Sequence, residues 1–168
     1  MSSCEPAPLA RRRILTLLGC LPLAACGFAP VYGPGGAGDA LRGTIAFAPP
    51  GNTLAFALVA RLEDRLGRAE APRYRLDYRI TTAQSSLGVT GAFDVTRINI
   101  AGNVGFTVTE IATGSVVQSD DVSTFTAYAT SGSPVATLAA RRDALDRLMI
   151  ALADQVVTRL MAGAADWP

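Results

Sequence analysis

The chain of 168 residues contains no histidine, and all 15 of its basic residues are arginine, so lysine is absent as well. Without histidine the chain cannot form a Ser-His-Asp or Cys-His nucleophile system, and it lacks the commonest metal ligand. Without lysine it cannot form a P-loop, a Ser-Lys dyad or a Schiff base. Two carboxylates could act as an acid and base pair, but the spacing of the acidic residues singles out no such pair. These absences predict a protein that is not an enzyme and has no metal site.

Charged residues are also scarce. They make up 17% of the chain, against 49% hydrophobic residues, and the formal net charge is +1. A chain this close to neutral offers no general nucleic-acid-binding surface, so any basic site must be local. The length is typical of one domain that buries a core.

The N-terminal residues have the layout of a secretory signal. Residues 11–13 are consecutive arginines, and residues 14–25 form an uncharged, mainly apolar run. This run is shorter than the roughly 20 apolar residues of a membrane-spanning helix. It ends in Leu23-Ala24-Ala25-Cys26, which closely resembles the bacterial lipobox. We therefore predict cleavage after residue 25 and a covalent lipid on Cys26, made of S-diacylglycerol and N-acyl groups. An ordinary signal peptide that ends near a cysteine is the alternative.

The predicted cleavage bears on cysteine chemistry and on localisation. Cys4 and Cys20 would leave with the signal peptide, so the mature chain would have no disulfide. Buried acyl chains contribute about 0.8 kcal/mol per CH₂, so a multiply acylated Cys26 would anchor the protein firmly. Residue 27 is glycine rather than aspartate. By resemblance to the sorting rule of enteric bacteria, this favours the outer membrane, with the domain on its periplasmic side. No cofactor is expected other than the lipid.

The composition divides the chain into a signal peptide (1–25), a lipidated N-terminus with a flexible tether (26–40), one α+β domain (41–163) and a short tail (164–168). The tether is predicted because residues 33–39 are rich in glycine.

Hydrophobic periodicity predicts the first elements of the domain. Residues 44–48 predict a short strand. Leucines spaced by four residues predict a helix over 53–66, with Asn52 as its N-cap and Gly67 as its C-cap.

Three further strands are expected after this helix. Residues 74–80 alternate between apolar and polar side chains, with the period of two that a half-buried strand requires. The next run contains Phe93 and Val95 out of phase with its other apolar residues, which predicts a bulge or a bend near Thr96. A turn then leads to a returning strand over 116–128, whose two faces the pattern does not define.

A long helix closes the domain. Ser133 is expected as its N-cap, Pro134 as its first residue and Gly163 as its end, with Leu138 and Leu145 on the apolar side. Short turns between consecutive strands imply antiparallel pairing. We therefore predict an α+β fold in which two helices pack on one face of a mainly antiparallel four-stranded sheet.

The segment Cys26-Gly27-Phe28-Ala29-Pro30-Val31-Tyr32-Gly33 resembles the mature start of the LptE family of lipopolysaccharide-assembly lipoproteins, in its alphaproteobacterial form. The composition of the last helix and the order of elements are similar to that family as well. The resemblance implies a non-catalytic plug inside an LptD-type outer-membrane β-barrel. It further implies that the plug helps the barrel fold and assists lipopolysaccharide delivery to the outer leaflet. The alternative is an outer-membrane auxiliary lipoprotein of an ABC-type lipid transport system.

Arginines are the candidate ligand-binding residues. Arg73, Arg75 and Arg79 are expected on one face of one strand, where successive same-face residues lie about 6.5–7 Å apart and guanidinium groups could bind several lipopolysaccharide phosphates. Arg97 could join them from the neighbouring strand. The alternative is an ordinary solvated face that Asp77 partly neutralises.

Aromatic residues supply the other candidates. Phe28 and Tyr32 lie close to the predicted anchor, so we expect them at the membrane interface or against the barrel wall. Tyr74 and Tyr78 share the apolar phase of their strand and are expected in the core. Trp167 is expected in a loosely ordered tail.

Overall fold

The computed structural model describes residues 33, 36–89, 95–130 and 133–168. The predictions for the signal peptide, for Cys26, Phe28 and Tyr32, and for Phe93 lie outside these residues. In chain order the elements are α2 (Ala37–Leu41), β1 (Ile45–Phe47), α3 (Thr53–Leu66), β2 (Tyr74–Val89), β3 (Val95–Glu110), β4 (Val116–Ala129), α4 (Pro134–Gly163) and a 3₁₀ helix (Ala164–Asp166).

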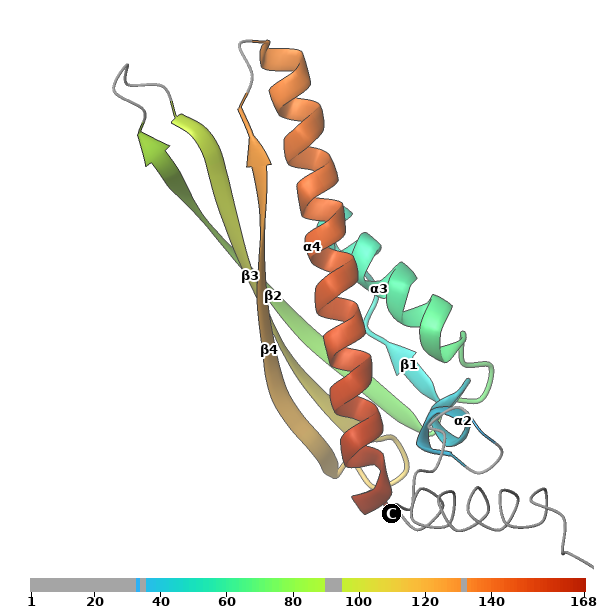
Figure 1. Ribbon diagram of the computed structural model, residues 1–168. Helices are drawn as coiled ribbons and strands as arrows, with labels where there is room; N and C mark the ends of the chain where they lie inside the picture. The colour runs from blue at the N-terminus through green and yellow to red at the C-terminus, as the bar shows by residue number, and fades with distance from the viewer. Residues whose placement is uncertain (1–32, 34–35, 90–94, 131–132) are drawn as a thin grey trace, which may run out of the picture.

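The predicted fold class is confirmed, with one correction to the sheet. The four strands lie in the order β1-β2-β3-β4, and β2, β3 and β4 pair antiparallel. β1 pairs parallel to β2, so the sheet is mixed. The reason is the connection between them: α3 carries the chain back to the end at which β1 began, and such a crossover makes neighbouring strands parallel. Figure 1 shows α3 and α4 lying together against the sheet.

A bulge or a bend was predicted near Thr96, and the bulge is absent from the pairing of β2 with β3. Their register is continuous from Tyr74 opposite Glu110 to Val89 opposite Val95. Val95 is an odd-numbered position of a regular strand, whereas Ile98 and Ile100 are even-numbered positions. Regular alternation therefore accounts for the difference in phase without an inserted residue. The irregularity lies instead between Val108 and Thr109, in the pairing of β3 with β4.

Both ends of α3 are where local signals predict them. The side chain of Asn52 accepts a hydrogen bond from the backbone N–H of Ala55 at 2.9 Å, which caps the first turn. Gly67 follows the last residue with φ of +77°, a conformation that glycine adopts without strain. The leucines predicted for the apolar side include the buried Leu58 and Leu62.

The long helix α4 packs against β3, β4 and α3. Its predicted start at Pro134 and its predicted end at Gly163 are both confirmed, and a 3₁₀ turn over Ala164–Asp166 follows. Leu138 is 46% exposed rather than in the core, since α4 extends past the end of α3 (Figure 1). By length and composition alone, the helical segment Pro134–Asp166 is long and apolar enough to cross a membrane. Helices that pack in a protein core meet the same two criteria, and α4 packs in the core.

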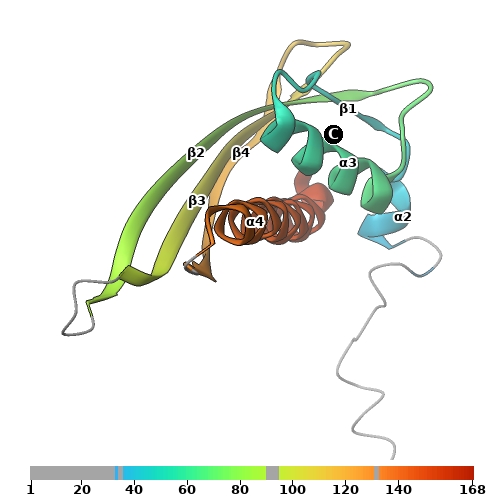
Figure 2. The ribbon, with the colours of Figure 1, turned by 90° about the horizontal axis from the view of Figure 1, so that it is seen from above.

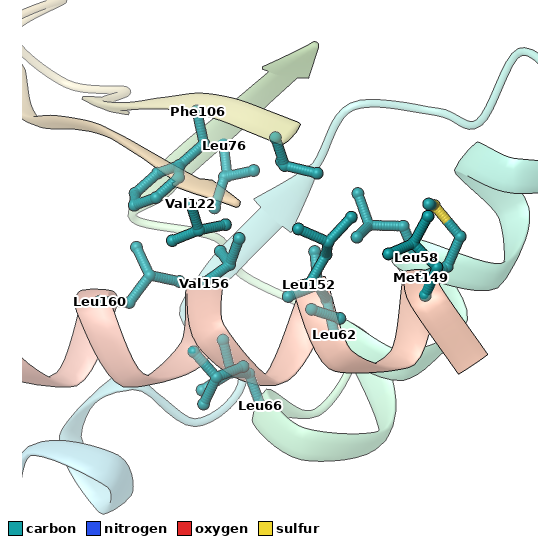
Figure 3. Close-up of a cluster of buried hydrophobic side chains, with 14 of the residues drawn as sticks. Leu58, Leu62, Leu66, Leu76, Phe106, Val122, Met149, Leu152, Val156 and Leu160 are labelled. Carbon is teal, nitrogen blue, oxygen red and sulfur yellow. The ribbon is translucent and has the colours of Figure 1, made fainter. Parts of the chain in front are cut away.

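The core lies between the two helices and one face of the sheet (Figure 3). Leu148 and Leu152 of α4 sit directly over Gly102 of β3. A Cβ atom at Gly102 would lie 2.9 Å from Cδ1 of Leu152 and 3.0 Å from Cδ2 of Leu148. The absence of a side chain at this glycine lets α4 approach the sheet closely.

The tether and tail predictions need correction within the described residues. The last residues of the predicted tether form α2, and Leu41 at its end is 3% exposed. The tail is packed rather than loose: the ring of Trp167 meets the ring of Tyr74 edge-on, with centroids 4.8 Å apart. The main-chain oxygen of Pro168 accepts a hydrogen bond from the Tyr74 hydroxyl at 3.0 Å. Long-range contacts of this kind leave no trace in local composition.

Candidate functional site

One face of the sheet carries no helix among the described residues. Figure 2 shows α3 and α4 on the concave side of the curved sheet, with the convex side uncovered. The register defines this surface, which we call the open face. From β2, β3 and β4 in turn, it comprises Arg75, Asp77, Arg79, Thr81, Ala83, Ser85, Arg97, Asn99, Ala101, Asn103, Gly105, Thr107, Ser119, Asp121, Ser123, Phe125 and Ala127.

The side chains of the open face are mostly small and polar, and few of them are charged. Its side chains bond to one another across strands: the amide of Asn103 donates to the carboxylate of Asp121 at 3.2 Å, and the hydroxyls of Thr107 and Ser119 lie 3.3 Å apart. Such pairs stabilise the sheet without an apolar cover. The face can therefore stay in water or meet a polar partner surface.

The arginine row predicted from the sequence is divided in the structure. Arg75 is exposed, and its Nη2 lies 3.0 Å from a carboxylate oxygen of Asp77. Arg79 is exposed on the open face, and no ion pair among the described residues involves it. Asp77 and Arg79 both line one shallow hollow, together with Gly105 and Thr107. Arg75 and Arg79 therefore remain as exposed guanidinium groups at the same end of the sheet.

Arg73 turns away from the row. Its guanidinium donates to the Glu110 carboxylate at 3.1 and 3.2 Å and to the main-chain oxygen of Pro168 at 2.5 Å. Glu110 is itself buried and accepts a further hydrogen bond from the Thr113 hydroxyl at 2.9 Å. Arg73 thus neutralises the buried carboxylate of Glu110. It also holds Pro168, which follows the 3₁₀ helix, in place. Sequence reasoning missed this because both partners are distant in the chain.

Arg97 lies on the same side of the sheet but far from the other arginines. It pairs with Leu87 of β2, whereas Arg79 pairs with Gly105. The eight strand positions between Arg97 and Gly105 correspond to about 26 Å. Arg97 therefore cannot contact the same small group as Arg79.

Phe125 is a surface residue that sequence reasoning did not single out. Its side chain is 71% exposed on the open face of the edge strand β4, beside a shallow hollow lined by Ala83, Ala101 and Ser123. The prediction for 116–128 left the faces of this strand undefined. The register with β3 defines them, with Val122 and Tyr128 buried and Phe125 on the opposite face.

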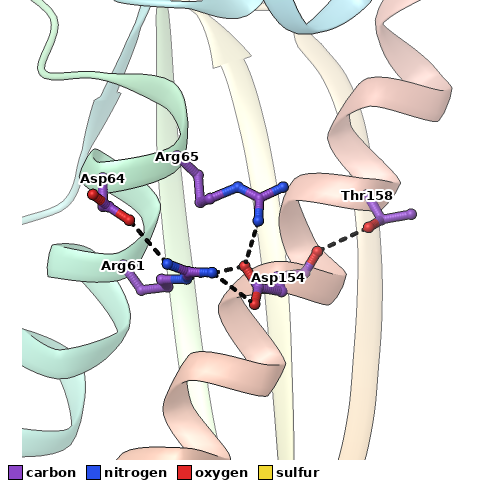
Figure 4. A network of polar contacts seen from close by, with 5 residues as sticks. All are labelled: Arg61, Asp64, Arg65, Asp154 and Thr158. Carbon is purple, nitrogen blue, oxygen red and sulfur yellow. Dashed lines mark hydrogen bonds and ion pairs between the residues drawn. The ribbon is translucent and has the colours of Figure 1, made fainter. Parts of the chain in front are cut away.

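A second polar cluster joins the two helices (Figure 4). Nε and Nη2 of Arg61 donate to the two carboxylate oxygens of Asp154, each at 3.1 Å, and Arg65 lies 3.3 Å from the same carboxylate. The hydrogen bond to Asp154 raises the pKa of Arg61 above its ordinary value. This cluster fixes α3 against α4. Within the described residues, no group of three or more acidic, histidine or cysteine side chains could hold a metal ion.

Solved structures show that this fold occurs in bacterial lipoproteins. A candidate lipoprotein of Caulobacter crescentus CB15 superimposes with a TM-score of 0.64 at 18% identity, covering 77% of this chain and 96% of that one. Rare lipoprotein B of Shewanella oneidensis gives 0.55 at 15% identity, covering 73% and 94%. A minor lipoprotein of Acinetobacter baumannii gives 0.51 at 15% identity, covering 71% and 89%. At these identities the likeness concerns the fold alone.

The search of curated proteins found no match to this chain. The scan of family models matched residues 43–160 to the model described as LptE, lipopolysaccharide-assembly. That match spans β1, α3, the three antiparallel strands and nearly all of α4. The chain belongs to the LptE family of lipopolysaccharide-assembly proteins.

Proposed function

We propose that this chain is an outer-membrane lipoprotein that forms a plug within an LptD-type β-barrel and assists lipopolysaccharide assembly at the cell surface. It makes and breaks no bond itself. The lipid on Cys26 anchors it on the periplasmic side of the membrane. Family membership supports the pathway, and the open face supports the mode of action.

The open face is the observation that carries this proposal. The lumen of outer-membrane barrels is polar, in contrast to their lipid-facing side. A plug therefore needs a rigid surface that forms hydrogen bonds without a large net charge. Hydroxyl and amide side chains such as Asn103, Thr107 and Ser123 supply this, and Phe125 offers one exposed apolar contact. Helices cover the other face and keep the sheet rigid.

Lipopolysaccharide phosphates would be bound by Arg75 and Arg79. Both guanidinium groups are exposed at one end of the open face, and arginine suits phosphate because it offers two parallel donors. Arg97 would serve a separate group, about 26 Å along the strand. Arg73 contributes indirectly, by holding the end of the sheet. Phe28 and Tyr32 would contact the membrane interface or the barrel wall.

Co-purification from detergent-solubilised outer membranes tests the proposal. The wild-type chain should bring down an LptD-type barrel, and mass spectrometry should find acyl groups on Cys26. Recovery of an inner-membrane permease instead of the barrel would favour the ABC-type lipid transport alternative.

A charged substitution locates the interface. Ser123→Arg places a long cation on the open face, where it should reduce barrel recovery at least tenfold because it prevents close contact. Ala151→Arg makes the same change at an exposed position of α4 and should leave recovery unchanged. Equal recovery of both variants would exclude the open face as the barrel-binding surface.

A further inference from the structure

The outer edge of β2 is unpaired over most of its length in the described chain. β1 pairs only with residues 74–76 of β2, which continues to Val89. The main-chain oxygen of Leu76 accepts a hydrogen bond from Ala48 on the β1 side at 2.9 Å. Because backbone groups alternate along a strand, the even-numbered residues direct their N–H and C=O groups to this outer side. From Tyr78 to Ser86, these groups have no backbone partner among the described residues.

The odd-numbered residues show the complementary pattern. Ile111 at the end of β3 donates its N–H to the main-chain oxygen of Arg73 at 2.9 Å. Odd positions of β2 thus bond to β3, and even positions are left for another strand. The free edge follows from the hydrogen-bond pattern itself and does not depend on side-chain placement.

This edge lacks the features with which proteins protect exposed strands. Charged side chains, proline and bulges normally prevent an edge from pairing with another chain. Residues 81–86 contain no charge and no proline, and their register with β3 is regular. The opposite edge differs. β4 carries Asp120 and Asp121, its register with β3 is irregular, and Arg159 of α4 lies 3.6 Å from Asp120.

We propose that the outer edge of β2 accepts an extended segment of a partner protein as an additional strand. The flanking side chains indicate the chemistry of that segment. Thr81, Ala83 and Ser85 on one face and Thr82, Gln84 and Ser86 on the other are exposed, small or polar, and uncharged. Main-chain hydrogen bonds would therefore provide most of the recognition. The incoming segment is uncharged, with small or polar side chains and no proline at the pairing positions.

The area of the edge favours a partner protein over a second copy of this chain. Residues 81–86 span about 20 Å of a surface about 10 Å thick, so edge pairing alone buries roughly 400 Å² in total. Stable interfaces bury at least about 1,200 Å². Two copies joined only here would fall short, whereas a barrel that also covers the adjoining open face supplies the remaining area. In this respect the inference rests on the proposed function, and the segment belongs to the barrel partner.

Proline substitution provides the test, because it removes a single N–H. Thr82→Pro deletes an outward N–H that the fold does not use, and edge strands tolerate proline at such positions. Thr82→Ala changes the side chain but keeps the N–H. We expect Thr82→Pro to reduce co-purification of the LptD-type barrel at least tenfold and Thr82→Ala to leave it unchanged. Gln84→Pro, at the next outward position, should repeat the loss. Circular dichroism of the purified variants establishes that they fold.

Amide hydrogen exchange provides a second measurement on the wild-type chain. The outward amides of Ile80, Thr82 and Gln84 should exchange rapidly in the free protein and at least tenfold more slowly in the barrel complex. A complex that withstands both proline variants, or that leaves these amides unprotected, overturns the edge pairing and spares the proposed function. Failure of the wild-type chain to bind any barrel overturns both. A Thr82→Cys variant that forms disulfide-linked dimers in membranes would assign the edge to a second copy and so overturn the choice of partner.

Discussion

Gly102→Ala should destabilise the fold, although alanine ordinarily stabilises a strand relative to glycine. The added Cβ would lie 2.9 Å from Cδ1 of Leu152 and 3.0 Å from Cδ2 of Leu148. Both leucines are at most 1% exposed, so the surrounding core restricts their movement. Overpacking of this kind costs about 1–3 kcal/mol. The more favourable backbone of alanine returns about 0.5–1 kcal/mol. The two figures leave a net loss of up to about 2.5 kcal/mol, with a middle value of about 1 kcal/mol, and we expect a Tm lower by about 2–10 °C.

Guanidinium unfolding measured by tryptophan fluorescence gives the free energy of unfolding. Trp167 is the single tryptophan of the chain, and it packs on Tyr74 at the base of the sheet. Gly105→Ala is the matched control, since Gly105 lies on the same strand and a Cβ atom added there on the open face would meet nothing within 4 Å. This variant should be as stable as the wild type or slightly more so. A Gly102→Ala protein at least as stable as wild type would refute the close approach of α4 to β3.

Two further predictions concern the ion pairs and the exposed arginines. Asp154→Ala removes the carboxylate that joins Arg61 and Arg65 across the two helices, so Tm should fall by about 2–4 °C in thermal melts, with a smaller effect in 1 M salt. Asp64→Ala, which affects a contact within α3 only, should lower Tm less. Arg79→Glu should weaken binding of purified lipopolysaccharide about tenfold without changing the melt, because it reverses the charge of an exposed guanidinium. Arg141→Glu makes the same charge change at an exposed position of α4, and an equal loss there would contradict a local phosphate site.

The helix ends could be predicted because their determinants are local. Asn52 and Gly67 act on the first and last turns of α3, and leucines four residues apart place its apolar side in the core. The faces of β4 could not be predicted in this way. Thr124 and Thr126 lie on its helix-covered side while Phe125 points to solvent, so polarity and burial do not coincide. Only the pairing with β3 determines the orientation.

The arginine row shows the same division. Arg75 and Arg79 lie on the open face because alternation along a strand is a local rule. Arg73 departs from it because Glu110 and Pro168, 37 and 95 residues away, bind its guanidinium. The packing of Trp167 on Tyr74 is equally non-local. The sequence therefore predicts which residues alternate, and tertiary contacts decide which of them remain available.

The short helix α2 and the segment from Ala164 to Pro168 line one shared hollow, so the first and last described elements meet at one pole of the molecule. From that pole β2 runs 16 residues, or about 50 Å at the usual rise per residue. The hydrocarbon layer of a bilayer is only about 30 Å thick. In the proposed barrel complex, the sheet would act as a rigid arm longer than this hydrocarbon layer is thick. The far end of β2 would then reach the level of the opposite leaflet without any change in the fold.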